Sequence, residues 1–177
     1  MSLIYITGIA GAGKSTIKDE LRRRGFEAFG TDEDNLAAFY HNETGENVGN
    51  DVPSSVRTEQ WRRAHSWKVP REAVEELRDR AKDKPIFLCG VVSNDDEFWG
   101  LFSQVIALSI NKATLVQRLR DRPNNSYGKL DHELRDVLEW QETAEEAYVK
   151  LGAQIVDSTR PLNEVVDEIL SICKIKR

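Results

Sequence analysis

Nine residues close to the N-terminus have the types and the spacing that hold a nucleoside triphosphate. The stretch Gly8-Ile9-Ala10-Gly11-Ala12-Gly13-Lys14-Ser15-Thr16 matches G-x-x-x-x-G-K-[ST] at every fixed position. Glycines let the backbone approach phosphate oxygens, and successive N–H groups at a helix N-terminus attract negative charge. Lys14 can then reach the β- and γ-phosphates, and the Ser15 hydroxyl can bind Mg²⁺. We therefore predict a triphosphate site formed by Gly8, Gly11, Ala12, Gly13, Lys14, Ser15 and Thr16, with Lys14 in the catalytic step and Ser15 on the metal.

The flanking sequence distinguishes a phosphate loop from a glycine-rich turn that only caps a surface helix. An apolar, β-prone run at residues 3–6 precedes the stretch, and Ile17 and Leu21 follow at helical spacing. A strand, a turn and a helix N-terminus in this order favour the phosphate loop.

Two carboxylates, Asp32 and Asp34, follow the next predicted strand at residues 26–30. Phosphoryl transfer needs Mg²⁺ held beside Ser15 and a group that orients or deprotonates the acceptor hydroxyl. We predict that Asp32 holds the metal through water and that Asp34 is the catalytic residue that positions the acceptor. In the alternative interpretation, Asp32 caps a helix, and Glu33 and Asp34 interact with the dipole of its first turn.

Basic residues before a turn-rich segment form a candidate lid at about residues 120–132. Arg118 and Arg122 are four residues apart and share one helical face, whereas Arg120 points elsewhere. Arginines on a closing segment stabilise the charge on a transferring phosphoryl group. We predict that Arg118 and Arg122 bind the donor and that Arg122 is catalytic. The alternative is a solvated basic helix end.

The sequence leaves open whether a cluster of aromatic, basic and amide side chains lines an acceptor pocket: Trp61, Arg62, Arg63, His65, Trp67 and Asn94. Aromatic rings beside cations suit a ligand pocket, but tryptophans packed in the core with solvated arginines explain the pattern equally well. Residues 86–89 lead to Gly90 and not to the aspartate with which motor ATPases and GTPases hold Mg²⁺. The chain also lacks an N-K-x-D guanine signature, so we predict ATP as the nucleotide.

Composition restricts the class of protein. A chain of 177 residues is long enough for one domain with a substantial core, and we predict a single domain over residues 1–177. The net charge of −5 argues against nucleic acid as the main partner. No apolar run approaches the ~20 residues of a membrane span, and the N-terminus lacks the features of a signal peptide. Cys89 and Cys173 are predicted as packed thiols in a reducing cytoplasm.

Short apolar strands alternate with helices, which predicts an α/β fold of three layers around a five-stranded parallel sheet. The predicted strands are at residues 3–6, 26–30, 85–92, 105–108 and 153–156. Helices are predicted after the phosphate loop, over 31–40, 57–67 and 70–81, from 94 and 111, over 130–150, and from 161, with a loop at 41–55. Ligands bind at the carboxyl ends of parallel strands, so we expect residues 8–16, 32–34, 90–94 and 157–161 along one edge.

With these motifs the chain resembles the small P-loop kinases, namely the adenylate, shikimate and gluconate kinases. Asp32-Glu33-Asp34 resembles the D-x-D of shikimate kinases, whose first acid lies by the metal and whose second binds the acceptor hydroxyl. Arg118-Leu-Arg120-Asp-Arg122 is similar to the R-[IL]-x-x-R of adenylate kinases, which implies adenine stacking by Arg118 and phosphate contact by Arg122. Residues 157–161 resemble the loop that cups the other side of adenine, which implies that Arg160 and Pro161 bind the nucleotide.

Several departures from these kinases leave the acceptor unidentified. Gly90 is not followed by the triple glycine of shikimate kinases, the G-[FY]-P-R segment of adenylate kinases is absent, and residues 124–128 differ from the gluconate-type lid. We expect a cytoplasmic, ATP- and Mg²⁺-dependent phosphotransferase acting on a hydroxyl or phosphate of a small metabolite, as a monomer or homodimer. The alternatives are a nucleotide-dependent switch or ATPase, and a kinase of nucleic-acid ends.

Overall fold

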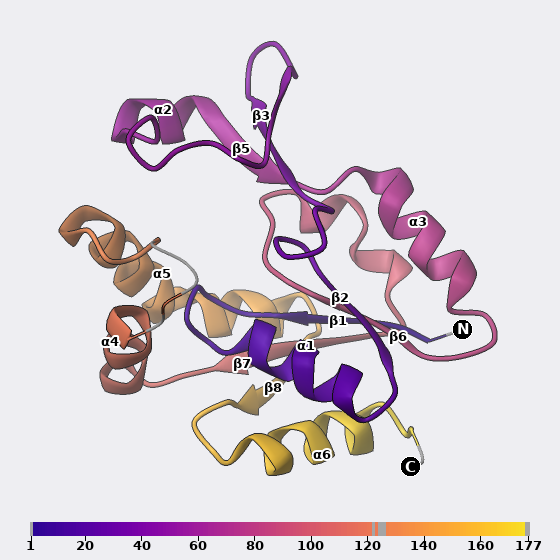
Figure 1. The fold of residues 1–177 in the computed structure, drawn as a ribbon. Helices are drawn as coiled ribbons and strands as arrows, with labels where there is room; N and C mark the ends of the chain where they lie inside the picture. The colour runs from indigo at the N-terminus through magenta and orange to yellow at the C-terminus, as the bar shows by residue number, and fades with distance from the viewer. Residues whose placement is uncertain (1, 122, 124–126, 176–177) are drawn as a thin grey trace.

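A parallel sheet of five strands forms the centre of the protein (Figure 1). The computed structural model describes residues 2–121, 123 and 127–175. The strands are β1 (Leu3–Thr7), β2 (Glu27–Gly30), β6 (Ile86–Cys89), β7 (Gln104–Ser109) and β8 (Gln154–Asp157). They are arranged in the order β2-β6-β1-β7-β8, and every residue of the central strand β1 is buried. Such burial requires helices on both faces, which explains the continuous apolar runs in the sequence.

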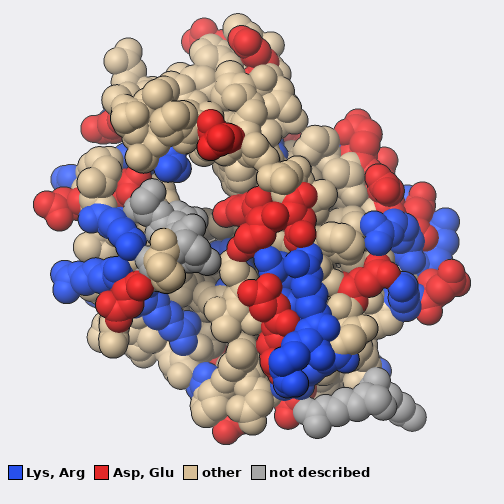
Figure 2. Space-filling view, viewed as in Figure 1, with Lys and Arg blue, Asp and Glu red and all other residues tan. Residues whose placement is uncertain are grey.

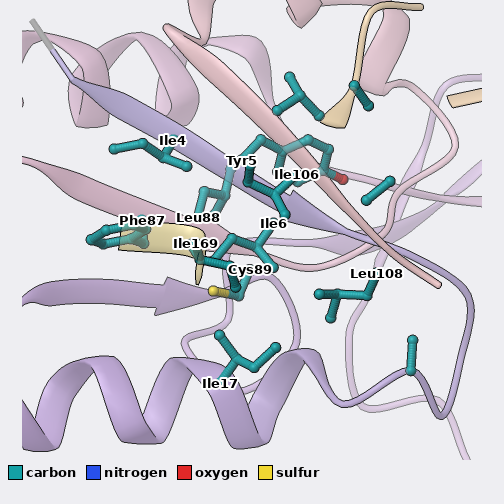
Figure 3. Packing of buried hydrophobic residues seen from close by; sticks show 14 of the residues in the cluster. Ile4, Tyr5, Ile6, Ile17, Phe87, Leu88, Cys89, Ile106, Leu108 and Ile169 are labelled. Atoms are coloured by element: carbon teal, nitrogen blue, oxygen red, sulfur yellow. The ribbon is translucent and has the colours of Figure 1, made fainter. Parts of the chain in front are cut away.

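The helices divide between the two faces of this sheet. α1 (Lys14–Arg23) and α6 (Leu162–Ile172) pack together on the face to which Ile6 points, where Ile17 and Ile169 lie near it (Figure 3). Thr7, the next residue, points to the opposite face and donates a hydrogen bond of 3.3 Å to Tyr148 of α5 (Asp131–Lys150). α3 (Arg71–Arg80) contacts β6, and α4 (Lys112–Asp121) packs against α5. The predicted α/β fold class with a five-stranded parallel sheet is confirmed.

A second, antiparallel sheet lies between β2 and α3, where the sequence predicted helices. It contains β3 (Ala38–His41), β4 (Asn47–Gly49) and β5 (His65–Lys68) in the order β4-β3-β5, next to the short helix α2 (Glu59–Ala64). Together they form a lobe beyond the carboxyl edge of the large sheet (Figure 1). We call these four elements the small lobe.

Within the small lobe the structure differs from two of the predicted helices and from the loop predicted at 41–55, which contains the strand β4 and the last residue of β3. Residues 31–35 form turns and residues 38–41 a strand, so the helix predicted over 31–40 is wrong. The helix predicted over 57–67 is confirmed only for Glu59–Ala64. The physical reason is cross-strand pairing: Phe39 lies opposite Trp67, and their ring centroids are 4.6 Å apart. Aromatic pairs across strands stabilise a sheet, and the apolar residues were mistaken for a helical stripe.

The remaining predicted elements need smaller changes. The helix predicted from residue 94 is replaced by two single 3₁₀ turns, η1 (Asp95–Glu97) and η2 (Trp99–Leu101). The helix predicted over 130–150 is present as α5, and Pro161 is the N-cap of α6. Among the described residues, no helix has both the length and the apolar character needed to cross a membrane.

Candidate active site

The loop between β1 and α1 has the backbone conformation of an anion-binding turn. Gly13 has φ +102° as the N-cap of α1, a left-handed conformation that glycine adopts without strain. Gly11, with φ +86°, packs so closely on α4 that an added Cβ would lie 2.9 Å from Cδ1 of Leu115. Ala12 is fully buried below the loop. The N–H groups of the first turn of α1 are therefore free of side-chain caps and available to phosphate oxygens.

Lys14 and Ser15 begin α1 and both face the cleft beyond the loop. Lys14 Nζ donates hydrogen bonds to the carbonyl oxygens of Gly8 (2.7 Å) and Ile9 (2.8 Å). This ammonium group therefore lies folded over the loop that the sequence identified. Thr16 is exposed and also lines the cleft.

Glu33, which the sequence analysis assigned no role at the metal, is the acid beside Ser15. The Ser15 hydroxyl donates a short hydrogen bond to Glu33 Oε1, and Glu33 Oε2 lies 3.4 Å from Nζ of Lys18. Lys18 is buried behind the loop. Burial alone would raise the pKa of Glu33, but the hydrogen bond from Ser15 and the charge of Lys18 outweigh it and lower the pKa. Glu33 is therefore held as a carboxylate at the Ser15 hydroxyl.

The two aspartates on either side of Glu33 point in different directions. Asp32 lines the cleft, and its Oδ1 accepts hydrogen bonds from Oγ1 of Thr31 (2.8 Å) and Nε1 of Trp67 (3.2 Å). Asp34 Oδ2 instead accepts from Arg22 Nη2 (2.7 Å) and from the backbone N–H of Gly30 (2.6 Å).

Asp34 does not line the cleft, so its placement does not support the acceptor role predicted for it. Burial raises its pKa, but the hydrogen bonds from Arg22 and the Gly30 N–H more than compensate, and the pKa is below its ordinary value. The carboxylate of Asp34 therefore links the turn after β2 to Arg22 of α1. Of the two acids in the predicted pair, only Asp32 faces the place where substrates would bind.

Two arginines close the side of the cleft away from the small lobe. Arg118 of α4 donates through Nη2 to the carbonyl oxygen of Ser158 (2.8 Å) and through Nη1 to that of Ala12 (3.4 Å), so it spans from the phosphate loop to the β8–α6 loop. Arg160 lines the cleft and forms an ion pair with Glu168 of α6. Pro161 fixes the start of α6 without lining the cleft. The predicted catalytic residue Arg122, and part of the predicted lid, lie outside the described residues.

The cleft has a volume of about 1700 Å³ and runs from the phosphate loop to the small lobe. Figure 2 shows an opening between this lobe and the body of the protein. The small lobe contributes Phe39, Arg62, His65 and Trp67, and Arg57 lies just before its helix α2.

The residues whose role the sequence left open separate into two groups. Arg62, His65 and Trp67 line the cleft, and Arg62 also forms an ion pair of 2.8 Å with Asp136. Trp61, Arg63 and Asn94 do not line it. Trp61 packs against Phe39 within the small lobe. Arg63 is exposed and paired with Glu59.

Asn94 has a structural role that its sequence position did not reveal. It is buried, and its side-chain amide is hydrogen-bonded to both the N–H (3.2 Å) and the C=O (3.0 Å) of Val69. It therefore joins the end of the small lobe to the segment after β6.

The donors around Ser15 fit Mg²⁺ and do not fit a metal held by protein ligands alone. Among the described residues there is no group of three or more His, Cys, Asp or Glu side chains that could hold a metal ion. Mg²⁺ prefers one or two protein oxygens together with water and substrate phosphates. A hydroxyl and a carboxylate at the end of a phosphate loop provide such oxygens.

The chain is similar in sequence to one described family and in fold to several kinases. The profile of the AAA domain family (AAA_18) matches residues 4–148. No curated protein matches the chain. Shikimate kinase from Aquifex aeolicus VF5 shares 20% identity over 97% of this chain and 96% of its own, with a TM-score of 0.60.

Two further solved structures have the same architecture. Shikimate kinase from Acinetobacter baumannii, solved with shikimate, has a TM-score of 0.62 at 14% identity, covering 97% of this chain and 92% of its own. Gluconokinase from Sinorhizobium meliloti 1021 has a TM-score of 0.55 at 19% identity, covering 98% and 91%. At such identities the likeness shows the fold and leaves the substrate to be argued from the site.

Proposed function

The chain belongs to the AAA domain family and has the fold of small-molecule P-loop kinases, and from this premise we propose that it is an ATP- and Mg²⁺-dependent phosphotransferase. It would move the γ-phosphate of ATP to a small metabolite. The observation that carries the proposal is the cleft, in which the phosphate loop and the small lobe face one another. A second compartment beside the phosphates is what a second substrate requires, whereas a simple nucleotide switch has no use for it.

On the donor side, each proposed role follows from a position in the cleft. Lys14 leaves the loop carbonyls for the β- and γ-phosphates, which the N–H groups of the loop also bind. Arg118 lies against the phosphate loop and Ser158, where it can contact adenine or the phosphates. Arg160 borders the same end of the cleft.

On the metal side, we assign Ser15 and Glu33, with Asp32 as a further acid that lines the same cleft. When bound, Mg²⁺ neutralises charge that develops on the transferring phosphoryl group. Glu33 holds the Ser15 hydroxyl, and Lys18 holds Glu33, so both oxygens are oriented before the nucleotide arrives.

On the acceptor side, we assign Asp32 the role that the sequence analysis gave to Asp34. An acceptor hydroxyl at Asp32 donates its hydrogen bond to the carboxylate, and its oxygen attacks the γ-phosphorus. A new P–O bond forms as the bond from the γ-phosphorus to the bridging oxygen of ADP breaks. The hydroxyl proton passes to Asp32 and then to solvent. The hydrogen bond from Trp67 fixes the carboxylate toward the small lobe throughout.

The test is phosphoryl transfer from ATP and Mg²⁺ to pooled metabolites, followed by ADP release and mass spectrometry of the products. We expect one pool to raise ADP release well above the hydrolysis background and to yield a phosphorylated compound. Lys14→Ala should abolish the signal. Slow hydrolysis that no pool stimulates would contradict the proposal and favour the ATPase or switch alternative.

Asp32→Asn and Asp34→Asn form a matched pair for the acceptor role. We expect Asp32→Asn to lower transfer by about 10²–10⁴-fold while ATP affinity changes little, because only proton transfer and orientation are lost. Asp34→Asn should retain transfer. The opposite result would return the acceptor role to Asp34.

A further inference from the structure

The small lobe presents a wall of aromatic rings to the cleft. Phe39 of β3 and Trp67 of β5 are cross-strand partners, and both line the cleft. Trp61 supports Phe39 from behind at a centroid distance of 4.9 Å and stacks on His65 at 4.0 Å. The wall is therefore braced by Trp61, a ring that does not itself line the cleft. Such rings offer a flat apolar surface on which a planar group can stack.

Asp32, the residue proposed to bind the acceptor hydroxyl, is hydrogen-bonded to one of these rings. Nε1 of Trp67 donates a hydrogen bond of 3.2 Å to Oδ1 of Asp32. A molecule that stacks on Trp67 and carries a hydroxyl beside its ring would therefore place that hydroxyl within reach of Asp32. The ring and the reacting hydroxyl must be close together in the same small molecule.

Arg57 differs from the other cations of the cleft. Lys14, Arg62, Arg118 and Arg160 all have hydrogen bonds or ion pairs to protein oxygens. Within the described part of the chain, the Nε atoms of Arg57 and Arg62 are both buried without a hydrogen-bond partner, but Arg62 is paired through Nη1 with Asp136, whereas Arg57 has no hydrogen bond or ion pair to a described residue. A half-buried guanidinium that lines a cleft without a protein acceptor suits an anionic ligand group.

The acidic residues beside the phosphate loop determine where in the cleft an anionic group of the ligand can bind. Asp32 and Glu33 both line the cleft there, and a phosphate presented as acceptor would meet two carboxylates at close range. A neutral hydroxyl meets no such repulsion. The anionic group is then expected at Arg57, away from the reacting atom.

Resting on the proposed function, we infer that the acceptor is a flat-ringed compound with a hydroxyl group near the ring and a separate anionic group. The ring stacks on Trp67 and contacts the tilted ring of Phe39, the hydroxyl donates to Asp32, and a carboxylate or phosphate binds Arg57. The acceptor is thereby distinguished from a hydroxy acid without a flat ring and from a nucleotide whose phosphate is phosphorylated.

Equilibrium binding tests this inference without requiring transfer. Calorimetry with Mg²⁺ and a non-hydrolysable ATP analogue would compare three sets of probes. The first carries all three features: nucleoside 3′-monophosphates, with a free 5′-hydroxyl, and 4-(hydroxymethyl)benzoate. The second lacks the anion (nucleosides and benzyl alcohol), and the third lacks the aromatic ring (gluconate and shikimate). We expect at least one probe of the first set to bind tenfold or more tightly than its counterparts, and comparison within that set distinguishes phosphate from carboxylate.

Variants with matched controls assign the contacts. Arg57→Gln should weaken binding of the anionic probe by at least tenfold without changing binding of its uncharged counterpart, whereas Arg63→Gln, six residues further on and outside the cleft, should change neither. Trp67→Leu should weaken the binding of every probe that has an aromatic ring or base. Trp61→Phe, which keeps a ring behind the wall, should not weaken it. Retained thermal stability of each variant would exclude misfolding as the cause.

The outcomes separate this inference from the proposed function. Tight binding of the first set without transfer would support the inferred ligand class of the cleft and overturn the phosphotransferase. Transfer to gluconate or shikimate in preference to every ringed probe would overturn the acceptor class and leave the phosphotransferase intact. Failure of every first-set probe to bind, or equal effects of Arg57→Gln and Arg63→Gln, would also overturn the acceptor class.

Discussion

Gly30→Ala is a substitution that should remove Glu33 from Ser15 without altering Glu33 itself. Gly30 ends β2 and has no left-handed φ, so alanine fits its backbone. A Cβ at this position would lie far inside contact distance of Glu33 Oε2 and 3.2 Å from Cδ of Lys18. The carboxylate oxygen must then retreat by roughly 1.4 Å to regain ordinary contact at 3.4 Å. Such a movement breaks the arrangement with Ser15 and Lys18.

The expected magnitude follows from what the carboxylate does there. Loss of a group that orients a metal ligand typically costs 10- to 100-fold in metal affinity, or about 1.4–2.7 kcal/mol. We expect Gly30→Ala and Glu33→Gln each to weaken Mg²⁺ binding in the ADP complex by about this factor. The free energy of unfolding should change by no more than about 1 kcal/mol in Gly30→Ala, because the atom in the way is the end of a movable side chain.

The assay is a titration of Mn²⁺ or Mg²⁺ into the ADP complex, followed by electron paramagnetic resonance or calorimetry, which needs no turnover. If Gly30→Ala acts through Glu33, the double variant should bind metal as weakly as Glu33→Gln alone. Two independent losses that add in the double variant would refute the displacement argument. Unchanged metal affinity in Glu33→Gln would refute the role of Glu33 at the metal.

Three further predictions concern stability and reactivity. Because the pKa of Asp34 is lowered in the folded protein, its pairing with Arg22 stabilises the fold above the unfolded pKa near 3.9 and is lost as pH falls through the folded value. Asp34→Asn should therefore cost about 1–2 kcal/mol at pH 7 in chemical denaturation, and the difference from wild type should shrink below about pH 4. Burial raises the pKa of the Cys89 thiol to about 12, so it should resist thiol reagents at pH 8 until the protein unfolds. Gly90→Ala should lower stability by about 1–3 kcal/mol, because the new Cβ would lie 2.7 Å from Cβ of buried Thr31; an unchanged melting temperature would contradict this.

The large sheet was predictable because its strands are buried on both faces and its phosphate loop has fixed residue types. β1 and β6 are continuous apolar runs, and the loop after β1 needs glycine where the backbone is left-handed or packed against α4. Both properties leave a recognisable run of residue types in the sequence, apolar residues in the strands and fixed glycines in the loop, so they were predictable without the structure.

The small lobe was not predictable in the same way. Its strands are only three or four residues long, and β3 and β5 pair across more than twenty residues of intervening chain. Phe39, Trp61 and Trp67 are spaced so that they suit either a helical stripe or a cross-strand cluster. Tertiary pairing decides between the two, and a single sequence does not contain it.

The three consecutive acids after β2 show why residue type alone could not assign the site. The chain turns sharply here, since the N–H of Asp34 donates back to the carbonyl oxygen of Gly30. In this turn successive side chains diverge: Asp32 toward Trp67, Glu33 toward Ser15, and Asp34 toward Arg22. In the predicted helix, the three side chains would have pointed in other directions, set by the helical repeat. The D-x-D pattern lies at the edge of the cleft, but the turn determines which acid reaches Trp67, which reaches Ser15, and which only secures the backbone.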